Sequence, residues 1–273
     1  MKHYPPHIKI TLFIALLFMS LLAIAPLYYM LSGSLQEGKT FDAIDIIPDS
    51  LSLKGYSFIF SSSRMLRYIF NSLVASISVV IGNLILSTIV GYGFARYRFP
   101  GKEILFASVL AVMMIPPHVI IIPLYRLINF LGWYDSYAAL IIPWLINPLG
   151  VFLMRQYISS LPPEIEDAAR VDGAGDLYIV FRIIMPLAKP ALAVLAFQVF
   201  LTNWNWFLYP FILTSSDSMR TLPVALALLK GYQSIDYQQM FSASTISALP
   251  VIILFMIFQR RIISGLTAGA LKS

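Results

Sequence analysis

The chain has 273 residues, of which 59% are hydrophobic and only 12% are charged, and this balance excludes a soluble globular domain. The absence of cysteine and the scatter of the three histidines exclude disulfides and a thiolate metal site, so no metal centre is expected. The net charge is +6, but the basic residues form no continuous stripe, which argues against nucleic acid as a partner. The chain therefore belongs in a lipid bilayer.

Six apolar stretches follow one another along the chain. A membrane-spanning helix needs about 20 mostly apolar residues, and the stretches that qualify are 8–30, 68–94, 104–128, 137–156, 187–213 and 241–258. The first is too long for the apolar core of a signal peptide and is followed by only a weak cleavage site, so we interpret it as a retained anchor. The sequence predicts an all-α polytopic membrane protein with six transmembrane helices.

The basic residues predict the orientation of these helices. With the N-terminus in the cytoplasm, the inner segments hold twelve Lys and Arg against six Asp and Glu, whereas the outer segments hold seven of each. The excess of positive charge marks the cytoplasmic side, so both termini are expected there. Residues 1–273 then form one membrane domain with an external loop at 32–67, whose turn formers favour a small cap, a cytoplasmic loop at 159–186 and a cytoplasmic tail at 259–273.

The loop at 159–186 is the longest polar segment on the predicted cytoplasmic side. Pro162 and Pro163 with the acids that follow them favour the start of a short helix, and Gly173 favours its end. The run Leu177, Val180, Phe181 and Ile184 has helical spacing, and Pro186 is expected to end this second helix.

The first of these two helices has features that suit docking to another protein. Ala168 and Ala169 leave part of its surface without bulk, so another backbone can approach closely, and the neighbouring acids offer partners for arginine. The alternative is an ordinary connection whose charges only keep it soluble.

The spacing in this loop is similar to that of the "EAA" loop of ABC importer permeases, which reads Glu-Ala-Ala, three residues, Gly, nine residues, Ile, one residue, Leu-Pro. In this chain the corresponding residues are Asp167, Ala168, Ala169, Gly173, Ile183, Met185 and Pro186. Asp167 in place of Glu and Met185 in place of Leu are conservative departures. The shorter acid suggests that Glu166 takes over part of the ionic role.

The resemblance implies the ABC type I importer permease fold and a mechanical role for the loop. In that family the loop forms coupling helices that sit in a groove of the cytoplasmic ATPase and transmit the closure of the ATP-bound dimer to the membrane helices. The ATPase-coupling residues implied here are Glu164, Glu166, Asp167, Ala168, Ala169, Asp172, Gly173, Ile183 and Pro186.

The tail at 259–272 looks like the ending of carbohydrate-importer permeases of the maltose-type group, as do the runs at 99–102 and 220–224. In the relatives of that kind the tail reaches between the ATPase subunits, which implies contacts from Gly265, Thr267, Gly269 and Lys272. The alternative is a frayed terminus.

Two stripes of neutral polar residues are candidates for a translocation path. At 100° per residue, the fifth-span residues Gln198, Thr202, Asn205 and Tyr209 share an arc of roughly 60°. Ser72, Ser76, Asn83 and Ser87 of the second span share a similar arc. Amides, hydroxyls and the nearby Trp206 suit a neutral, hydroxyl-rich solute. The alternative is helix packing.

The chain has no Gly-x-x-x-x-Gly-Lys-[Ser/Thr] phosphate loop, so ATP and Mg²⁺ are expected on a partner ATPase, with no cofactor and no catalytic residue here.

The expected function is one permease half of an importer for a sugar or oligosaccharide, in a prokaryotic plasma membrane, which is the inner membrane in a Gram-negative cell. Expected partners are a second permease, a dimeric ATPase and an external solute-binding protein. The alternatives are a permease for another polar solute such as glycerol phosphate, a secondary transporter, and a membrane enzyme.

Overall fold

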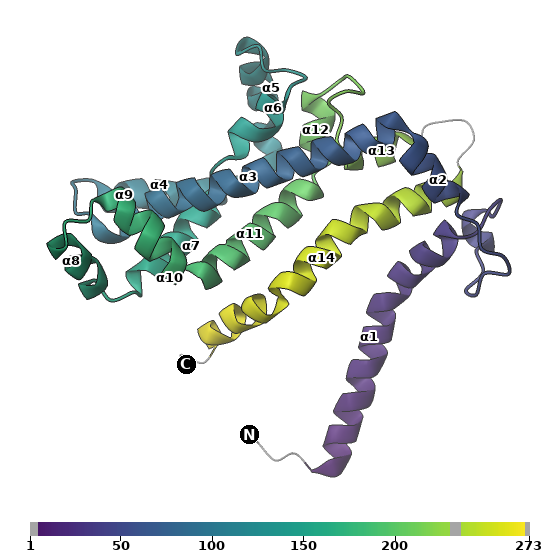
Figure 1. The fold of residues 1–273 in the computed structure, drawn as a ribbon, viewed down its shortest axis with the longest axis horizontal. Coiled ribbons are helices and arrows are strands. Elements are labelled where there is room, and N and C mark those ends of the chain that lie inside the picture. The colour runs from purple at the N-terminus through teal and green to yellow at the C-terminus, as the bar shows by residue number, and fades with distance from the viewer. Residues whose placement is uncertain (1–4, 230–235, 271–273) are drawn as a thin grey trace. The chain divides into compact units, whose positions relative to one another are not determined.

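The computed structural model describes residues 5–229 and 236–270, with the backbone alone for 260–270 and no side chain for Asp42 (Figure 1). Within these ranges the chain consists of helices and connecting turns and contains no strand, which confirms the all-helical prediction. Backbone contacts divide it into two compact units. One comprises Met1–Leu66 with Leu226–Pro250, and the other comprises Arg67–Ala225 with Val251–Ser273.

The first unit contains α1 (Pro6–Ser34), the 3-10 turn η1 (Phe41–Ala43), α2 (Lys54–Ser61) and the start of α14 (Tyr237–Ala270). The side chain of Gln36 holds the segment between α1 and α2 by two hydrogen bonds to the backbone of Asp45, at 2.7 and 2.9 Å. Gln238 of α14 donates to the carbonyl of Ser52 at 2.8 Å. The segment between α1 and α3 is shorter than the expected loop at 32–67, because α1 continues to Ser34 and α3 already begins at Ser63.

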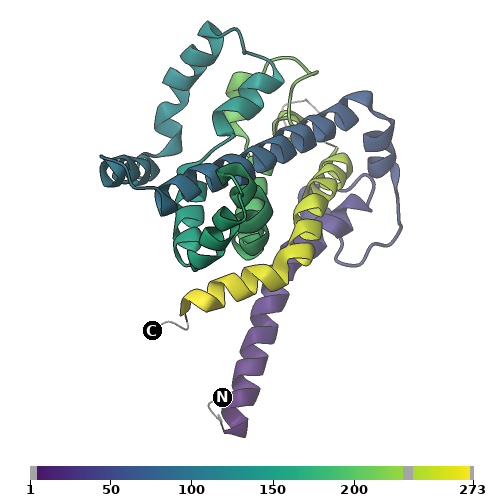
Figure 2. The ribbon, with the colours of Figure 1, turned by 60° about the vertical axis from the view of Figure 1, so that its left-hand side comes forward.

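In the second unit, α3 (Ser63–Arg96) packs against α7 (Pro148–Ser159) and α11 (Lys189–Trp204) around a core that includes Met154, Ile184 and Leu195 (Figure 1 and Figure 2). Small residues allow α3 to approach α7 closely. A Cβ on Gly91 would lie 2.9 Å from the backbone nitrogen of Arg155. α13 (Leu222–Leu229), like α3 and α14, has residues in both units.

Several predicted spans are interrupted. Residues 104–128 form α4 (Lys102–Met113), the 3-10 turn η2 (Pro117–Ile120) and α5 (Ile121–Phe130), with a bend of 95°. Pro116 and Pro117 explain the break, since proline lacks an N–H donor and pushes the preceding residue out of helical geometry. Residues 137–156 form α6 (Tyr137–Ile141), the 3-10 turn η3 (Ile142–Trp144) and α7, and residues 187–213 form α11 and α12 (Leu208–Leu213).

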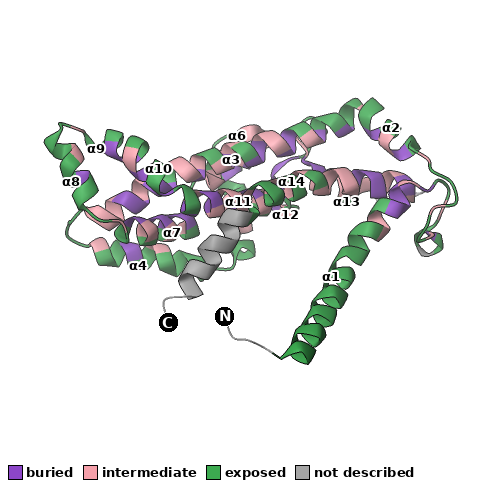
Figure 3. Cartoon of the chain, turned by 60° about the horizontal axis from the view of Figure 1, so that its bottom comes forward, coloured by how far each residue is buried: buried purple, intermediate pink, exposed green. Residues whose placement is uncertain are grey.

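Four helices or joined helices among the described residues are long and apolar enough to cross a membrane, and the number rises to six if each of two bent pairs is one span. This range includes the predicted six spans, which are reached only if each bent pair is one span. α1 exposes its apolar side chains along almost its whole length (Figure 3), as a helix does when lipid or another membrane helix is its solvent.

Candidate functional site

The loop at 159–186 folds as predicted in its first half. α8 (Glu164–Val171) follows the two prolines and carries three acids in its first turn, where the helix dipole favours negative charge. Gly173 has a φ of 85°, a left-handed conformation that favours glycine, and its N–H donates to the carbonyl of Arg170. These residues therefore make a short helix with a defined end.

The second half is a helix that ends at Leu187, one residue after Pro186. It runs through α9 (Asp176–Tyr178), a π turn η4 (Ile179–Ile184) and α10 (Met185–Leu187), and then turns by 84° into α11. Pro186 cannot donate to the carbonyl four residues before it, and the wider π turn accommodates this loss. Ile179 and Ile184 are buried in the core of the second unit, so this helix anchors the loop to the membrane helices.

A buried ion pair connects α8 to the end of α3. Arg96 Nε lies 2.7 Å from Glu166 Oε1, with the side chains only 15% and 6% exposed. The hydroxyl of Tyr92 donates to the other carboxylate oxygen of Glu166 at 2.9 Å, and Arg96 Nη2 donates to the carbonyl of Leu161 at 2.9 Å. Sequence reasoning placed Glu166 among residues that face an ATPase, whereas its carboxylate is turned inward and satisfied within this chain.

Arg170 extends this cluster across the glycine turn. Its Nη2 donates to the hydroxyl of Tyr92 at 3.2 Å and to Asp176 Oδ1 at 2.6 Å. Hydrogen bonds from Tyr97 and Arg170 hold the pKa of Asp176 below its ordinary value, and the bond to Asp176 raises the pKa of Arg170. Both groups are therefore charged at neutral pH, and they fix the spacing between α8 and α9.

The other predicted coupling residues lie at the surface. Ala169 and Ile183 are half-buried, and the exposed ones are Glu164, Asp167, Ala168, Asp172, Gly173 and Pro186. Apolar side chains that sequence reasoning missed are exposed among them, namely Val171 (88%), Leu177 (65%) and Tyr178 (59%). The sequence could have indicated them, because they are apolar residues inside a polar segment. These exposed apolar side chains and the exposed acids Glu164, Asp167 and Asp172 belong to the same short segment, which we call the docking surface, and α8 is largely exposed in Figure 3, as expected of a docking site.

A second candidate site is a cavity of about 500 Å³ in the same unit. Its polar lining comes from three helices and the turns beside them, and consists of Asn83, Asn147, Gln198, Thr202, Asn203, Trp144, Trp206 and Tyr209. None of the described residues that line it is acidic, basic or histidine. Gln198 Oε1 is buried and has no hydrogen-bond partner among the described residues. Such a lining can exchange hydrogen bonds with a neutral solute but offers no counter-ion to a charged one.

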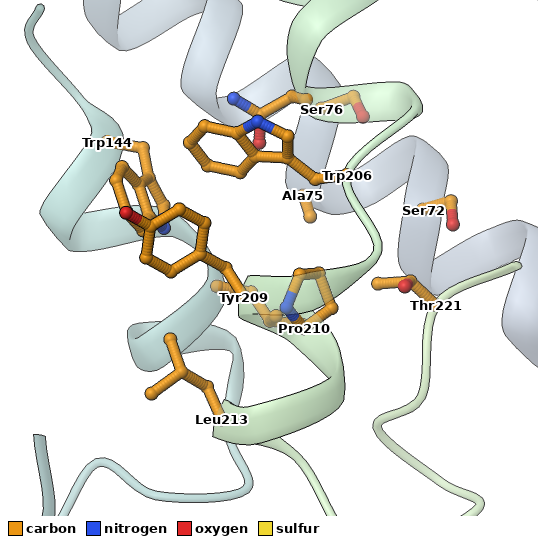
Figure 4. Close-up of a pocket in the computed structure, with 11 residues that line it drawn as sticks. Ser72, Ala75, Ser76, Trp144, Trp206, Tyr209, Pro210, Leu213 and Thr221 are labelled. Carbon is orange, nitrogen blue, oxygen red and sulfur yellow. The ribbon is translucent and has the colours of Figure 1, made fainter. Parts of the chain in front are cut away.

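An aromatic cluster forms one end of this cavity. The ring centroids of Trp144 lie 4.3 Å from Trp206 and 4.5 Å from Tyr209, and the hydroxyl of Tyr209 donates to the carbonyl of Pro117. Figure 4 shows these three rings converging beside a small pocket, with Ser72 and Ser76 approaching from α3. Aromatic faces next to amides are typical of surfaces that stack against sugar rings.

The predicted fifth-span stripe is only partly retained. Gln198, Thr202 and Tyr209 line the cavity, whereas Asn205 is not among its lining residues and donates to the carbonyl of Leu201 in its own helix. The calculation at 100° per residue assumed one continuous helix, but α11 ends at Trp204. Tyr209 reaches the cavity from α12 instead.

All four residues of the second-span stripe are buried, and Asn83, Ser72 and Ser76 line the cavity or the small pocket. Asn83 lines the cavity but also donates to the carbonyl of Trp144 at 2.7 Å. Ser76 is 1% exposed and lines only the small pocket. Ser72 accepts a hydrogen bond from the backbone of Leu222 at 2.8 Å, and Ser87 packs against Gly150.

The side chains of the residues predicted to make the tail contacts are not described by the structure. Gly265, Thr267 and Gly269 lie in the part of α14 for which only the backbone is described, and Lys272 lies outside the described residues.

Comparison with known proteins gives a consistent result. The family described as "Binding-protein-dependent transport system inner membrane component" matches residues 83–267. The chain is 38% identical to the arabinooligosaccharides transport system permease protein AraQ of Bacillus subtilis, over 100% of this chain and 99% of AraQ. It is 32% identical to the trehalose/maltose transport system permease protein MalG of Thermococcus litoralis, over 97% of each chain.

A solved structure also shares the fold. It is the crystal structure of a bacterial ABC transporter involved in the import of the acidic polysaccharide alginate, and it matches with a TM-score of 0.82 and 23% identity over 95% of this chain and 99% of that one.

Proposed function

The chain belongs to the family of binding-protein-dependent transport system inner membrane components, and we propose that it is a permease subunit of an ATP-driven importer for neutral sugars or oligosaccharides. The observation that carries the proposal is the uncharged cavity, whose mostly apolar lining includes several amide and aromatic side chains, in the same unit as an exposed docking surface. Relatives named for arabinooligosaccharide and trehalose or maltose transport agree with this substrate class.

In the proposed topology each bent pair contributes one span, the second through the residues from 187 onward, so that α8 and α9 remain outside the membrane. Six spans then cross the membrane and both termini lie in the cytoplasm, with residues 1–273 forming one membrane domain. The distribution of charge supports this orientation, because the loop containing α8 falls on the side with the excess of Lys and Arg.

The docking surface on α8 is proposed to bind a cytoplasmic ATPase. Val171, Leu177 and Tyr178 supply exposed apolar area, and Glu164, Asp167 and Asp172 supply acids in the same segment. An ATPase groove with an apolar floor and arginines at its rim would complement this surface. The ATPase would bind ATP and Mg²⁺, and the tail at 259–273 is proposed as a second contact with it.

Two further partners complete the proposed complex. The cavity is only partly enclosed by this chain, which fits a path shared with a second permease subunit. The family is described as binding-protein-dependent, so an external solute-binding protein is the proposed source of substrate.

The cavity favours a neutral sugar over the alternative of glycerol phosphate. An anion buried away from water needs a cationic partner, and the described residues that line this cavity include neither lysine nor arginine. A sugar needs hydrogen-bond donors and acceptors, and the amide of Gln198 offers such a group, because its Oε1 has no partner among the described residues.

Uptake into proteoliposomes tests the proposal. The complex would be purified from its own host through an N-terminal tag on this chain, and arabinotriose, maltose, trehalose and glycerol 3-phosphate would be offered with the binding protein. We expect ATP-dependent uptake of at least one of the three sugars and not of glycerol 3-phosphate. Uptake driven by an ion gradient without ATP, or uptake of glycerol 3-phosphate alone, would refute the proposed function.

A further inference from the structure

Four side chains at the junction of α3 and α8 form one hydrogen-bonded cluster, which we call the α3–α8 tie. Tyr92 and Arg96 belong to α3, and Glu166 and Arg170 belong to α8. Residues four positions apart lie on the same face of a helix, so each helix presents one pair to the other. The sequence contains both spacings, but only the fold brings the two pairs together.

The tie is nearly fully satisfied within the chain. Glu166 uses one carboxylate oxygen for Arg96 and the other for Tyr92, and the Tyr92 hydroxyl also accepts from Arg170. Glu166 is only 4% exposed. Charge-assisted hydrogen bonds shielded from water are shorter and stronger than neutral ones, so the two helices are joined at a defined distance and angle.

The backbone provides a softer connection from α8 to the membrane helices. It passes through the turn at Gly173 and Gly175 and then through a π turn and the bend of 84° at Ala188. Glycines and breaks in a helix allow local adjustment. The side-chain tie connects α8 to α3 directly, without passing through the glycine turn, the π turn or the bend.

α3 leads directly from the tie to the cavity. It is an uninterrupted helix without proline from Ser63 to Arg96, and Asn83 of this helix lines the cavity. Nine residues separate Asn83 from Tyr92, which corresponds to about 14 Å along a helix axis. A displacement of α8 that carries Tyr92 and Arg96 with it therefore also moves one wall of the cavity.

We propose that the α3–α8 tie is a positioning element that makes the docking helix and the cavity-lining helix α3 move as one body. The inference rests on the proposed function of α8 as an ATPase contact. It gives Glu166 an internal role, in contrast to the exposed acids Glu164 and Asp167, which remain the proposed contacts of the partner.

The test distinguishes binding of the ATPase from coupling of ATP hydrolysis to sugar transport. Glu166→Gln keeps the size of the side chain but removes its charge, and Tyr92→Phe removes a single hydroxyl from the same cluster. A matched control is Glu103→Gln, because Glu103 also pairs with an arginine, Arg155, at 3.3 Å, but its side chain is 74% exposed. Sugar uptake, ATP hydrolysis and the amount of co-purified ATPase would be measured for each complex in proteoliposomes with the sugar that the wild type transports fastest.

For Glu166→Gln we expect the ATPase to co-purify at the wild-type level while the sugar transported per ATP hydrolysed falls about fivefold, the size expected for loss of coupling between two sites. Tyr92→Phe should show a smaller loss in the same ratio. Glu103→Gln should remain within about twofold of the wild type, because exposed ion pairs contribute little.

Each remaining result has a distinct meaning. An unchanged transport ratio in both Glu166→Gln and Tyr92→Phe would overturn the inference. Loss of the ATPase from the Glu166→Gln complex, with Tyr92→Phe unchanged, would also overturn it and make Glu166 a partner contact. If Glu166→Gln fails to assemble, the ratio for Tyr92→Phe decides. Failure of the wild type to import any of the three sugars with ATP would instead count against the proposed function.

Discussion

The side chain of Asn147 donates to Oδ1 of Asn83 at 2.6 Å and so joins the start of α7 to the middle of α3. The same side chain accepts the backbone N–H of Gly150 at 2.6 Å, which makes Asn147 the N-cap of α7, with Pro148 at the first helical position. One residue therefore ends a turn, starts a helix and fixes one corner of the cavity, which both asparagines line.

Replacing Asn147 should destabilise the second unit. Asn147→Ala removes the cap and leaves Asn83 Oδ1 without this donor, and we expect a loss of about 1–2 kcal/mol. Asn147→Ser keeps a capping oxygen but not the amide donor, so its loss should be smaller. Thermal unfolding of the purified complex in detergent should give midpoints that fall in the order wild type, Asn147→Ser, Asn147→Ala. Equal midpoints for all three proteins would contradict this assignment.

The contact between Gly150 and Ser87 predicts different effects on stability when each residue is replaced by alanine. A Cβ on Gly150 would lie 2.5 Å from Ser87 Oγ and 3.1 Å from Ser87 Cβ, so Gly150→Ala should cost about 2 kcal/mol through overpacking. Ser87 Oγ is buried without a hydrogen-bond partner among the described residues. Ser87→Ala should therefore be neutral or stabilising, because it removes an unpaired polar atom.

The double variant Ser87→Ala/Gly150→Ala should recover part of the loss caused by Gly150→Ala alone, since the nearest clashing atom is gone. Detergent unfolding midpoints of the two single variants and the double variant form the required cycle. Simple additivity of the two single effects would show that the Ser87 hydroxyl is not the obstacle.

Val171 tests the proposed docking surface without disturbing the fold, because its side chain is 88% exposed. Val171→Asp places a charge among the exposed apolar side chains of the surface, and we expect about a tenfold weaker affinity for the ATPase, as for a desolvated interface residue. Val171→Thr has nearly the same shape and should weaken binding less. Titration of the purified ATPase against the permease in nanodiscs gives both affinities. Wild-type affinity for Val171→Asp would place the ATPase contact elsewhere.

Asp135 predicts a dependence on pH in the segment between the third and fourth predicted spans. Burial raises the pKa of Asp135, but hydrogen bonds from the Ser216 side chain and from the backbone N–H groups of Ser215 and Ser216 outweigh this effect, with help from Arg220, so the pKa lies below its ordinary value. A carboxylate with a lowered pKa in the folded state stabilises the protein above its unfolded pKa and loses that contribution as the pH falls through the folded value.

The unfolding midpoint of the wild type should therefore exceed that of Asp135→Asn by a constant amount between pH 7 and about pH 5, and the difference should narrow below about pH 4. Asparagine is the suitable replacement because it tolerates the left-handed conformation of this residue, which has a φ of 55°. A difference that stays constant down to pH 3 would mean that the Asp135 carboxylate does not contribute through its charge.

Local patterns in the sequence were sufficient for several features. The apolar composition placed the chain in a bilayer, and the prolines, acids and glycine around α8 predicted a short helix and its end, because these signals act over a few neighbouring residues. The spacing from Asp167 to Pro186 identified the family, which the match to residues 83–267 confirmed.

Only the tertiary structure decided which polar residues face a partner and which face the protein itself. Glu166, Glu164 and Asp167 look alike in the sequence, but Glu166 alone meets Arg96, a residue 70 positions away, and is buried. Likewise, the break in the helix after Trp204 leaves Asn205 out of the cavity lining and allows Tyr209 to reach the cavity from α12. Helical periodicity determines the face of a side chain within one straight helix, whereas breaks in the helix and contacts between distant segments determine what that face meets.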